Sequence, residues 1–236
     1  MSDAAALEVE HLTSGYGEAM VLRDVSFSLP AGEVLAILGK NGMGKSTLLK
    51  TVMGFLPAAQ GRIRIGGEDT TGLPPHRMAR RQVAYSPQEQ AIFQDLTVDE
   101  NLRLGLGSDR FYERELARVA QFFPFLAERR RQRAGTLSGG EQKMLLVARA
   151  LMFRPRLMLV DEITEGLQPS VTQRVADVLR AELGALGLAI QLIEQNVRFA
   201  LSLADRYAVL ARGEIVAGGR VGEPGAEAAI HEHLAV

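Results

Sequence analysis

The sequence predicts an α/β fold with a mainly parallel sheet, a small N-terminal antiparallel β subdomain and an inserted helical subdomain. Short apolar segments alternate with longer helical patterns, which is typical of parallel α/β sheets. The first thirty residues and Arg62–Asp69 alternate polar with apolar residues and contain turn glycines. The segment from about 95 to 150 is rich in Arg, Glu, Leu and Ala and has few strand signals. We expect one domain over residues 1–236.

Four apolar segments have the length of buried parallel strands. They are Glu33–Leu38, Leu157–Val160, Leu188–Ile193 and Tyr207–Leu210. Helical patterns follow the first three of them, over Ser46–Leu56, Val171–Leu186 and Asn196–Ala204. This order of elements is the reason to expect a parallel sheet with helices between its strands.

Composition excludes several classes of protein. The 236 residues are 47% hydrophobic, which suffices for a sizeable core, and the net charge of −1 gives no field that would favour nucleic acid. The absence of Cys excludes disulfides and thiolate metal sites. No apolar run approaches the roughly 20 residues of a membrane helix, and the N-terminus does not resemble a signal peptide. We therefore expect a soluble chain that reaches a membrane only through a partner.

Two polar clusters invite functional interpretations. The basic cluster Glu128–Arg133 is interpreted as a solvated helix face in preference to an anion site. The four histidines show no metal-ligand spacing, and we expect His231 and His233 to be solvated.

The segment GKNGMGKST, Gly39–Thr47, fits the phosphate-binding pattern G-x-x-x-x-G-K-[ST] in full. Its glycines allow successive backbone N–H groups to face an anion, and the following helix adds its positive end. We expect Lys45 to reach the β- and γ-phosphates and Ser46 to bind Mg²⁺. The alternative is a glycine-rich turn before an ordinary helix. The motif predicts a P-loop NTPase core, with Gly39, Asn41, Gly42, Gly44, Lys45, Ser46 and Thr47 around the phosphates.

The segment LMLVDEITEGLQPS, Leu157–Ser170, places carboxylates directly after a predicted buried strand. Ligands gather at the carboxyl edge of an open parallel sheet, so Asp161 is the expected second anchor for Mg²⁺. Glu162 should leave the other face of the strand and polarise an attacking water. A helix cap or turn is the alternative, and Glu165 has no assigned chemistry.

A second glycine-rich helix start lies at LSGGE, Leu137–Glu141. Ser138 could simply be an N-cap residue. However, a second anion-binding segment is hard to explain with one nucleotide. The segment resembles the signature motif of ABC-type ATPases, whose common form is LSGGQ, with Glu141 as a departure.

The resemblance covers nearly the whole chain and implies further roles. Tyr16 resembles the aromatic residue that stacks on adenine, although it could be a strand-edge tyrosine. Gln88 resembles the Q-loop glutamine, which links the Mg²⁺ and water site to the transport subunits. Members of the family sandwich two ATP molecules in a head-to-tail dimer. The resemblance therefore implies that Ser138, Gly139 and Gly140 contact ATP held by the partner chain, that Asp161 supports Mg²⁺ and that Glu162 is the base.

Three residues depart from the common family pattern. Ile163 stands where Pro is usual, Gln168 where Asp is usual, and Gln195 where the switch His is usual. An amide can hydrogen-bond a γ-phosphate but cannot carry a proton. One branch of the family, the importers of branched-chain amino acids, urea and short-chain amides, also has Glu-Gln at the switch. The chain resembles that branch, with TEGLQPS closer to the urea and amide members.

The resemblance implies an ATP-hydrolysing motor subunit of an importer, using ATP and Mg²⁺. Its implied partners are membrane permease subunits, a second nucleotide-binding subunit that is a paralogue or an identical chain, and indirectly a solute-binding protein. It would lie on the cytoplasmic face of the inner or plasma membrane, without contact to nucleic acid. The alternatives are a soluble ABC ATPase acting on nucleic acid or the ribosome, and a weakly hydrolysing ATP-binding module.

Overall fold

The computed structural model describes residues 5–88 and 92–234 and is built around a six-stranded sheet, in the order β10-β9-β3-β8-β7-β6. Its strands are β3 (Val34–Leu38), β6 (Val83–Ser86), β7 (Leu157–Asp161), β8 (Ala189–Glu194), β9 (Arg206–Ala211) and β10 (Glu214–Arg220). Neighbouring strands from β9 to β6 are parallel, and β10 pairs with β9 in the antiparallel direction. The predicted mainly parallel sheet is confirmed.

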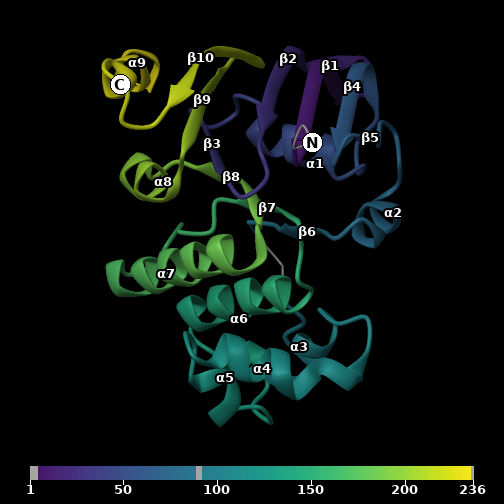
Figure 1. Ribbon diagram of the computed structural model, residues 1–236, viewed down its shortest axis with the longest axis vertical. Helices are drawn as coiled ribbons and strands as arrows, with labels where there is room; N and C mark the ends of the chain where they lie inside the picture. The colour runs from purple at the N-terminus through teal and green to yellow at the C-terminus, as the bar shows by residue number, and fades with distance from the viewer. Residues whose placement is uncertain (1–4, 89–91, 235–236) are drawn as a thin grey trace.

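A second sheet is antiparallel throughout, with strand order β2-β1-β4-β5. Its strands are β1 (Leu7–Tyr16), β2 (Ala19–Leu29), β4 (Ala58–Ile65) and β5 (Glu68–Asp69). Helix α1 (Lys45–Val52) contacts β1 and β2 on one side and β7 on the other, so it lies between the two sheets (Figure 1). The predicted N-terminal antiparallel subdomain is therefore present.

Helices form the lobe at the bottom of Figure 1. This lobe contains α3 (Val98–Arg103), η1 (Asp109–Phe111), α4 (Tyr112–Ala120), α5 (Phe125–Glu128), η2 (Ala134–Thr136) and α6 (Gly139–Met152). The other helices are α2 (Pro75–Arg80), α7 (Pro169–Leu186), α8 (Val197–Leu203) and α9 (Ala226–Leu234). Within residues 5–88 and 92–234, none of the helices has both the length and the apolar character needed to cross a bilayer.

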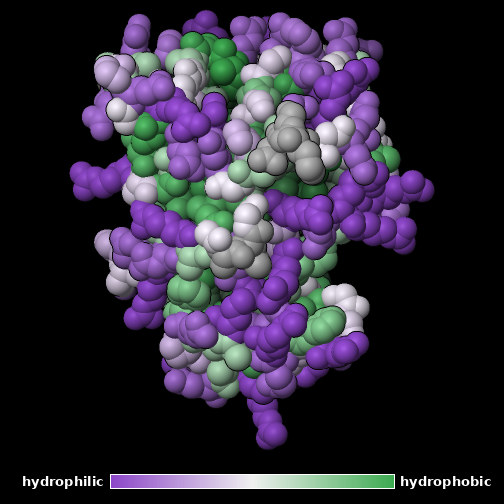
Figure 2. All heavy atoms as spheres, viewed as in Figure 1, coloured by the Kyte–Doolittle hydropathy of each residue, from purple (hydrophilic) through white to green (hydrophobic). Residues whose placement is uncertain are grey.

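The core consists of two hydrophobic clusters on opposite faces of the central sheet. Strand β3 shows the division, because Val34, Ala36 and Leu38 pack into one cluster while Leu35 and Ile37 pack into the other. Burial on both faces explains why these strands are uninterrupted apolar segments. Figure 2 shows that hydrophilic residues cover most of the visible face, with hydrophobic residues gathered mainly in its middle band.

Two predictions about helices were wrong. Helix α1 ends at Val52 rather than continuing to Leu56, because Gly54 follows with φ of 81°, a left-handed conformation that ends helices. The basic cluster is not a helix face either, since α5 ends at Glu128, Arg129–Arg131 lie in turns and Arg133 forms an isolated β-bridge with Thr97.

The position of Arg130 explains why the basic cluster leaves the helix. Its guanidinium lies 2.9 Å from a carboxylate oxygen of Asp99 and 2.8 Å from one of Glu113. These acidic residues come from α3 and α4, so the turn is fixed by contacts between elements that a local sequence pattern does not contain.

Candidate nucleotide-binding site

The phosphate-binding loop connects the carboxyl end of β3 to the N-terminus of α1. Its first glycine has no room for a side chain, since a Cβ on Gly39 would lie 2.4 Å from the carbonyl oxygen of Leu210. Gly44 has φ of 102° and is the N-cap residue of α1. Both positions require glycine, one for close packing and the other for its backbone conformation.

Lys45, the first residue of α1, is 4% exposed. Its Nζ donates to the carbonyl oxygens of Gly39, at 2.8 Å, and Lys40, at 3.0 Å. The same Nζ lies 3.5 Å from Oε1 of Glu162. The ammonium group is therefore held inside the loop, at the place where the motif predicts it should face phosphate.

Asp161, the last residue of β7, approaches the next residue of α1. Ser46 Oγ donates to Asp161 Oδ1 over 3.3 Å. Burial raises the pKa of Asp161 above its ordinary value, and the nearby Glu162 charge adds to this effect. A buried carboxylate beside a hydroxyl, with one long hydrogen bond, has the hard oxygen donors that Mg²⁺ prefers. These residues fit the metal that the sequence predicts.

The expectation that Glu162 leaves the opposite face of the strand was wrong, because the strand does not continue to this residue. The strand ends at Asp161, and Glu162 adopts φ of 46°, a left-handed conformation that is unusual for a side-chain-bearing residue. This turn directs its carboxylate toward the phosphate-binding loop. Oε2 of Glu162 accepts hydrogen bonds from Nε2 of Gln88, at 3.0 Å, and from Nε2 of Gln195, at 2.8 Å.

One pocket of about 360 Å³ lies at the carboxyl edge of the parallel strands, and most of these residues line it, whereas Gly39 and Asp161 lie outside its lining. The lining residues are Val21, Asn41, Gly42, Gly44, Lys45, Ser46, Thr47, Gln88, Glu162, Glu165 and Gln195. The fold thus brings the phosphate-binding loop and Glu162 together with Gln88 and Gln195. Carboxyl edges of open parallel sheets are the usual location of ligand sites.

Tyr16 and the signature segment lie outside the residues that line this pocket. Tyr16 ends β1 and is 50% exposed. Ser138 is the N-cap residue of α6, and a Cβ added to Gly139 would meet no atom within 4 Å, so this helix start is open. Gly140 lies closer to α7, because a Cβ there would contact Val171 at 3.4 Å.

Glu141, the acidic residue of the signature segment, stabilises the start of α6. Glu141 Oε2 accepts from the backbone N–H and the hydroxyl of Ser138, both at 2.9 Å, and its own N–H donates to Ser138 Oγ. This reciprocal arrangement is a capping box. The bond from the Ser138 backbone holds the pKa of Glu141 below its ordinary value.

The sequence patterns assigned no chemistry to Glu165 and gave no role to Glu194, although both carboxylates lie near Glu162. Glu165 lines the pocket and accepts a hydrogen bond from Gln88 Nε2 at 2.6 Å. Glu194 lies at the end of β8 and is 2% exposed. The signal for Glu194 was present, because it follows an apolar strand and precedes Gln195, just as Asp161 follows an apolar strand and precedes Glu162.

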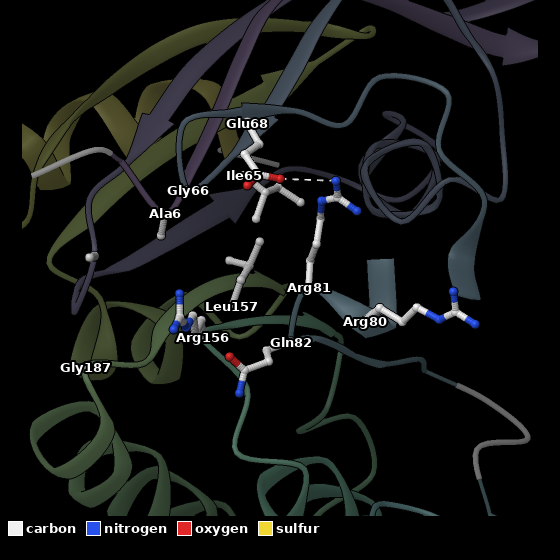
Figure 3. Close-up of a pocket in the computed structure, with 11 residues that line it drawn as sticks. Ala6, Ile65, Gly66, Glu68, Arg80, Arg81, Gln82, Arg156, Leu157 and Gly187 are labelled. Atoms are coloured by element: carbon white, nitrogen blue, oxygen red, sulfur yellow. Dashed lines mark ion pairs between the residues drawn. The ribbon is translucent and has the colours of Figure 1, made fainter. Parts of the chain in front are cut away.

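A further pocket of about 570 Å³ lies at the opposite edge of the central sheet, where β6 and β7 begin. Figure 3 shows Arg81 directed toward Glu68, with a distance of 3.1 Å between Nη2 and Oε2, while Arg80 points away. Since it lies at the amino ends of the strands and is lined by none of the predicted site residues, it is separate from the nucleotide site.

A phosphate-binding loop and a buried Asp-Glu pair lie together at the carboxyl edge of a parallel sheet. This arrangement defines a P-loop nucleoside triphosphatase. Comparisons with known proteins narrow this class. A protein-family model described as ABC transporter matches residues 22–165. The chain is 43% identical over 212 residues to the high-affinity branched-chain amino acid transport ATP-binding protein BraG of Pseudomonas aeruginosa, covering 89% of this chain and 91% of BraG.

Two further similarities agree with this result. The probable branched-chain amino acid transport ATP-binding protein LivF of Archaeoglobus fulgidus is 34% identical over 220 residues, covering 92% of this chain and 93% of LivF. The crystal structure of the ADP conformation of an ATP-binding cassette of an ABC transporter superposes with a TM-score of 0.84 at 26% identity, covering 97% of this chain and 98% of that one.

The chain belongs to the ABC transporter family, as an ATP-binding subunit with ATPase activity. The predicted resemblance, the fold class and the transport-motor function are thereby confirmed. Membership implies that the chain binds ATP, dimerises and associates with membrane permease subunits.

Proposed function

We propose that the chain hydrolyses ATP at this pocket with Mg²⁺ held by Ser46, Asp161 and Gln88, and with Glu162 as the general base. The observation that supports the proposal is the set of contacts made by the Glu162 carboxylate. It forms an ion pair with Lys45 and accepts hydrogen bonds from Gln88 and Gln195. A base must lie within hydrogen-bonding reach of the group it activates, and this carboxylate faces the phosphate-binding loop. Bound Mg²⁺ would neutralise charge on the phosphates.

Gln195 acts in this proposal by positioning. Its amide hydrogen-bonds Glu162 and can also bond a γ-phosphate, but it cannot accept a proton as a histidine can. Hydrolysis therefore relies on Glu162 for proton transfer. Ile163, the unusual residue after the base, is 1% exposed and packs in the main hydrophobic cluster, so its role is to anchor the turn.

The second half of each site comes from a partner chain in this proposal. Ser138, Gly139 and Gly140 contact ATP bound to the partner, and Tyr16 stacks on adenine. The open start of α6 supports this assignment, because a Cβ on Gly139 would meet no atom of the described residues within 4 Å. Residues 1–236 form one nucleotide-binding domain, with approximately 95–150 as its helical insertion. The partner motor is a paralogue or an identical chain.

The transported solute in this proposal is a branched-chain amino acid, or urea or a short-chain amide. The names of BraG and LivF support the first class, and the segment TEGLQPS supports the second. The chain would work at the cytoplasmic face of the membrane through its permease, with a solute-binding protein as an indirect partner. ATP closes the dimer and hydrolysis resets it.

Steady-state Mg²⁺-ATP turnover of Glu162→Gln tests the site. We expect the variant to bind ATP but to stall, so that a dimer accumulates in size-exclusion chromatography with ATP. Glu165→Gln is the matched control, because it removes a second carboxylate from the same pocket. Wild-type turnover in Glu162→Gln would refute the assignment, and a stall in Glu165→Gln alone would move the base to Glu165.

The solute class is tested by purification of the chain with its permease and solute-binding protein. Leucine, urea and acetamide are then titrated against the binding protein, and ATPase stimulation is measured with each. Stimulation by none of the three would refute the proposed solute classes.

A further inference from the structure

Glu194 is a buried carboxylate to which neither the sequence motifs nor the proposed mechanism gives a role. It ends β8 and is 2% exposed. Oε1 accepts the backbone N–H of Thr164 at 3.0 Å, and Oε2 accepts the Thr164 hydroxyl at 2.8 Å. The backbone N–H of Asn196 also donates to this carboxyl group. The donors come from two different loops, so the carboxylate joins them.

These two loops carry the residues that meet at the site. Thr164 follows Glu162 by two positions, and Glu194 directly precedes Gln195. The carboxylate of Glu162 and the amide of Gln195 are 2.8 Å apart. The bond between Glu194 and Thr164 therefore fixes the separation of the loops just behind the contact that faces the nucleotide.

The backbone of Glu162 supplies a second observation. Its φ of 46° is a sparsely populated conformation for a residue with a Cβ, and such a conformation persists only where the surroundings hold it. On one side of the turn, the Glu162 N–H donates to the carbonyl oxygen of Ile193 at 2.9 Å. On the other side, Thr164 is held by Glu194 through both its backbone and its side chain.

We propose that Glu194 is a positioning residue for ATP hydrolysis, which acts through Thr164 to hold the left-handed turn that aims Glu162 at the phosphate-binding loop. The inference rests on the proposed role of Glu162 as the base. Glu194 itself would not touch the nucleotide.

The contact is a charge-assisted one. Two oxygens of one carboxylate accept from two donors of one residue, which fixes both the position and the orientation of Thr164. A glutamine offers one acceptor oxygen, so the Thr164 hydroxyl would have to turn and accept from the amide of the glutamine. Glu194→Gln therefore keeps the size of the side chain but replaces the charge-assisted bonds with weaker neutral ones.

Thr164 allows a matched pair of variants. Thr164→Val has nearly the same shape but lacks the hydroxyl donor, whereas Thr164→Ser keeps the hydroxyl and lacks one methyl group. In Mg²⁺-ATP assays of the full chain, we expect Thr164→Val and Glu194→Gln to lower kcat by roughly 10- to 100-fold. KM for ATP should stay within about threefold, because the phosphate-binding loop is untouched. Thr164→Ser should restore most of kcat.

The double variant Glu194→Gln/Thr164→Val adds a test of coupling. Since both changes break the same contact, its kcat should resemble that of the more impaired single variant rather than the product of the two effects. Equal kcat for Thr164→Val and Thr164→Ser, or a rise in KM with unchanged kcat, would overturn the proposal. If Glu194→Gln does not fold, the Thr164 pair decides the question alone.

The reference variant Glu162→Gln separates this inference from the proposed function. An inactive Glu162→Gln together with a fully active Thr164→Val would overturn only the positioning role of Glu194. A fully active Glu162→Gln would overturn the assignment of the base, and the positioning role would fall with it.

Discussion

Glu194 should also make the stability of the protein depend on pH. Burial raises the pKa of its carboxyl group from an ordinary value of 4.5 to about 6, although the hydrogen bonds from Thr164 oppose this change. The folded protein therefore holds a proton at Glu194 in a pH range where the unfolded chain has released it. This contribution to stability is fully present below pH 4.5 and is lost as the pH rises through 6.

The expected size follows from the difference between the two pKa values. A difference of 6 − 4.5 = 1.5 units corresponds to about 2 kcal/mol of unfolding free energy, since one unit is worth about 1.4 kcal/mol. At pH 5 about 1 kcal/mol of this is recovered relative to pH 7.5. Glu194→Gln cannot titrate and lacks this dependence, but it shares every other ionisable group with the wild type.

The measurement is equilibrium unfolding in urea at a series of pH values between 5 and 7.5, on wild type and Glu194→Gln. The difference between their unfolding free energies should shift by about 1 kcal/mol across the series, in favour of the wild type at low pH. Glu227→Gln, which removes an exposed carboxylate from α9, serves as the control. A difference that stays constant, or that shifts the other way, would refute the reasoning.

Three other substitutions test the site and its support. Lys45→Ala removes the charge that is proposed to face the phosphates and should weaken ATP binding roughly 10- to 100-fold. Unchanged affinity in a nucleotide titration would count against the assignment. Gly39→Ala places a Cβ 2.4 Å from Leu210 O and should cost about 1–3 kcal/mol in urea unfolding, whereas Gly107→Ala, with open space around it, should not. Asn101→Ala leaves the Phe93 N–H and carbonyl without their buried partner and should cost about 2–4 kcal/mol, with a loss below about 1 kcal/mol contradicting this role.

The elements that depend only on neighbouring residues could be predicted from the sequence. Residues Val34–Leu38 are a short apolar segment buried on both faces of the sheet, as expected of a parallel strand, and the glycines after them fit the phosphate-binding pattern in full. The left-handed conformation of Glu162 could not be predicted in this way, because no glycine or asparagine marks it. It depends on Ile193 and Glu194, which lie about thirty residues away and approach only after β7 and β8 pair.

Contacts between residues far apart in the sequence also explain the basic cluster after α5. One of these contacts joins the cluster to the signature segment. Arg129 Nη1 lies 2.9 Å from Oε1 of Glu141, the residue that replaces the common glutamine of the motif. An additional carboxylate beside a predicted phosphate-binding helix start would oppose an anion, and a neighbouring guanidinium reduces that effect. Glu141 can therefore cap α6 without adding net negative charge where the partner's nucleotide is proposed to bind. Arg129, the first arginine of the basic cluster, thus supplies the positive charge that partly balances Glu141.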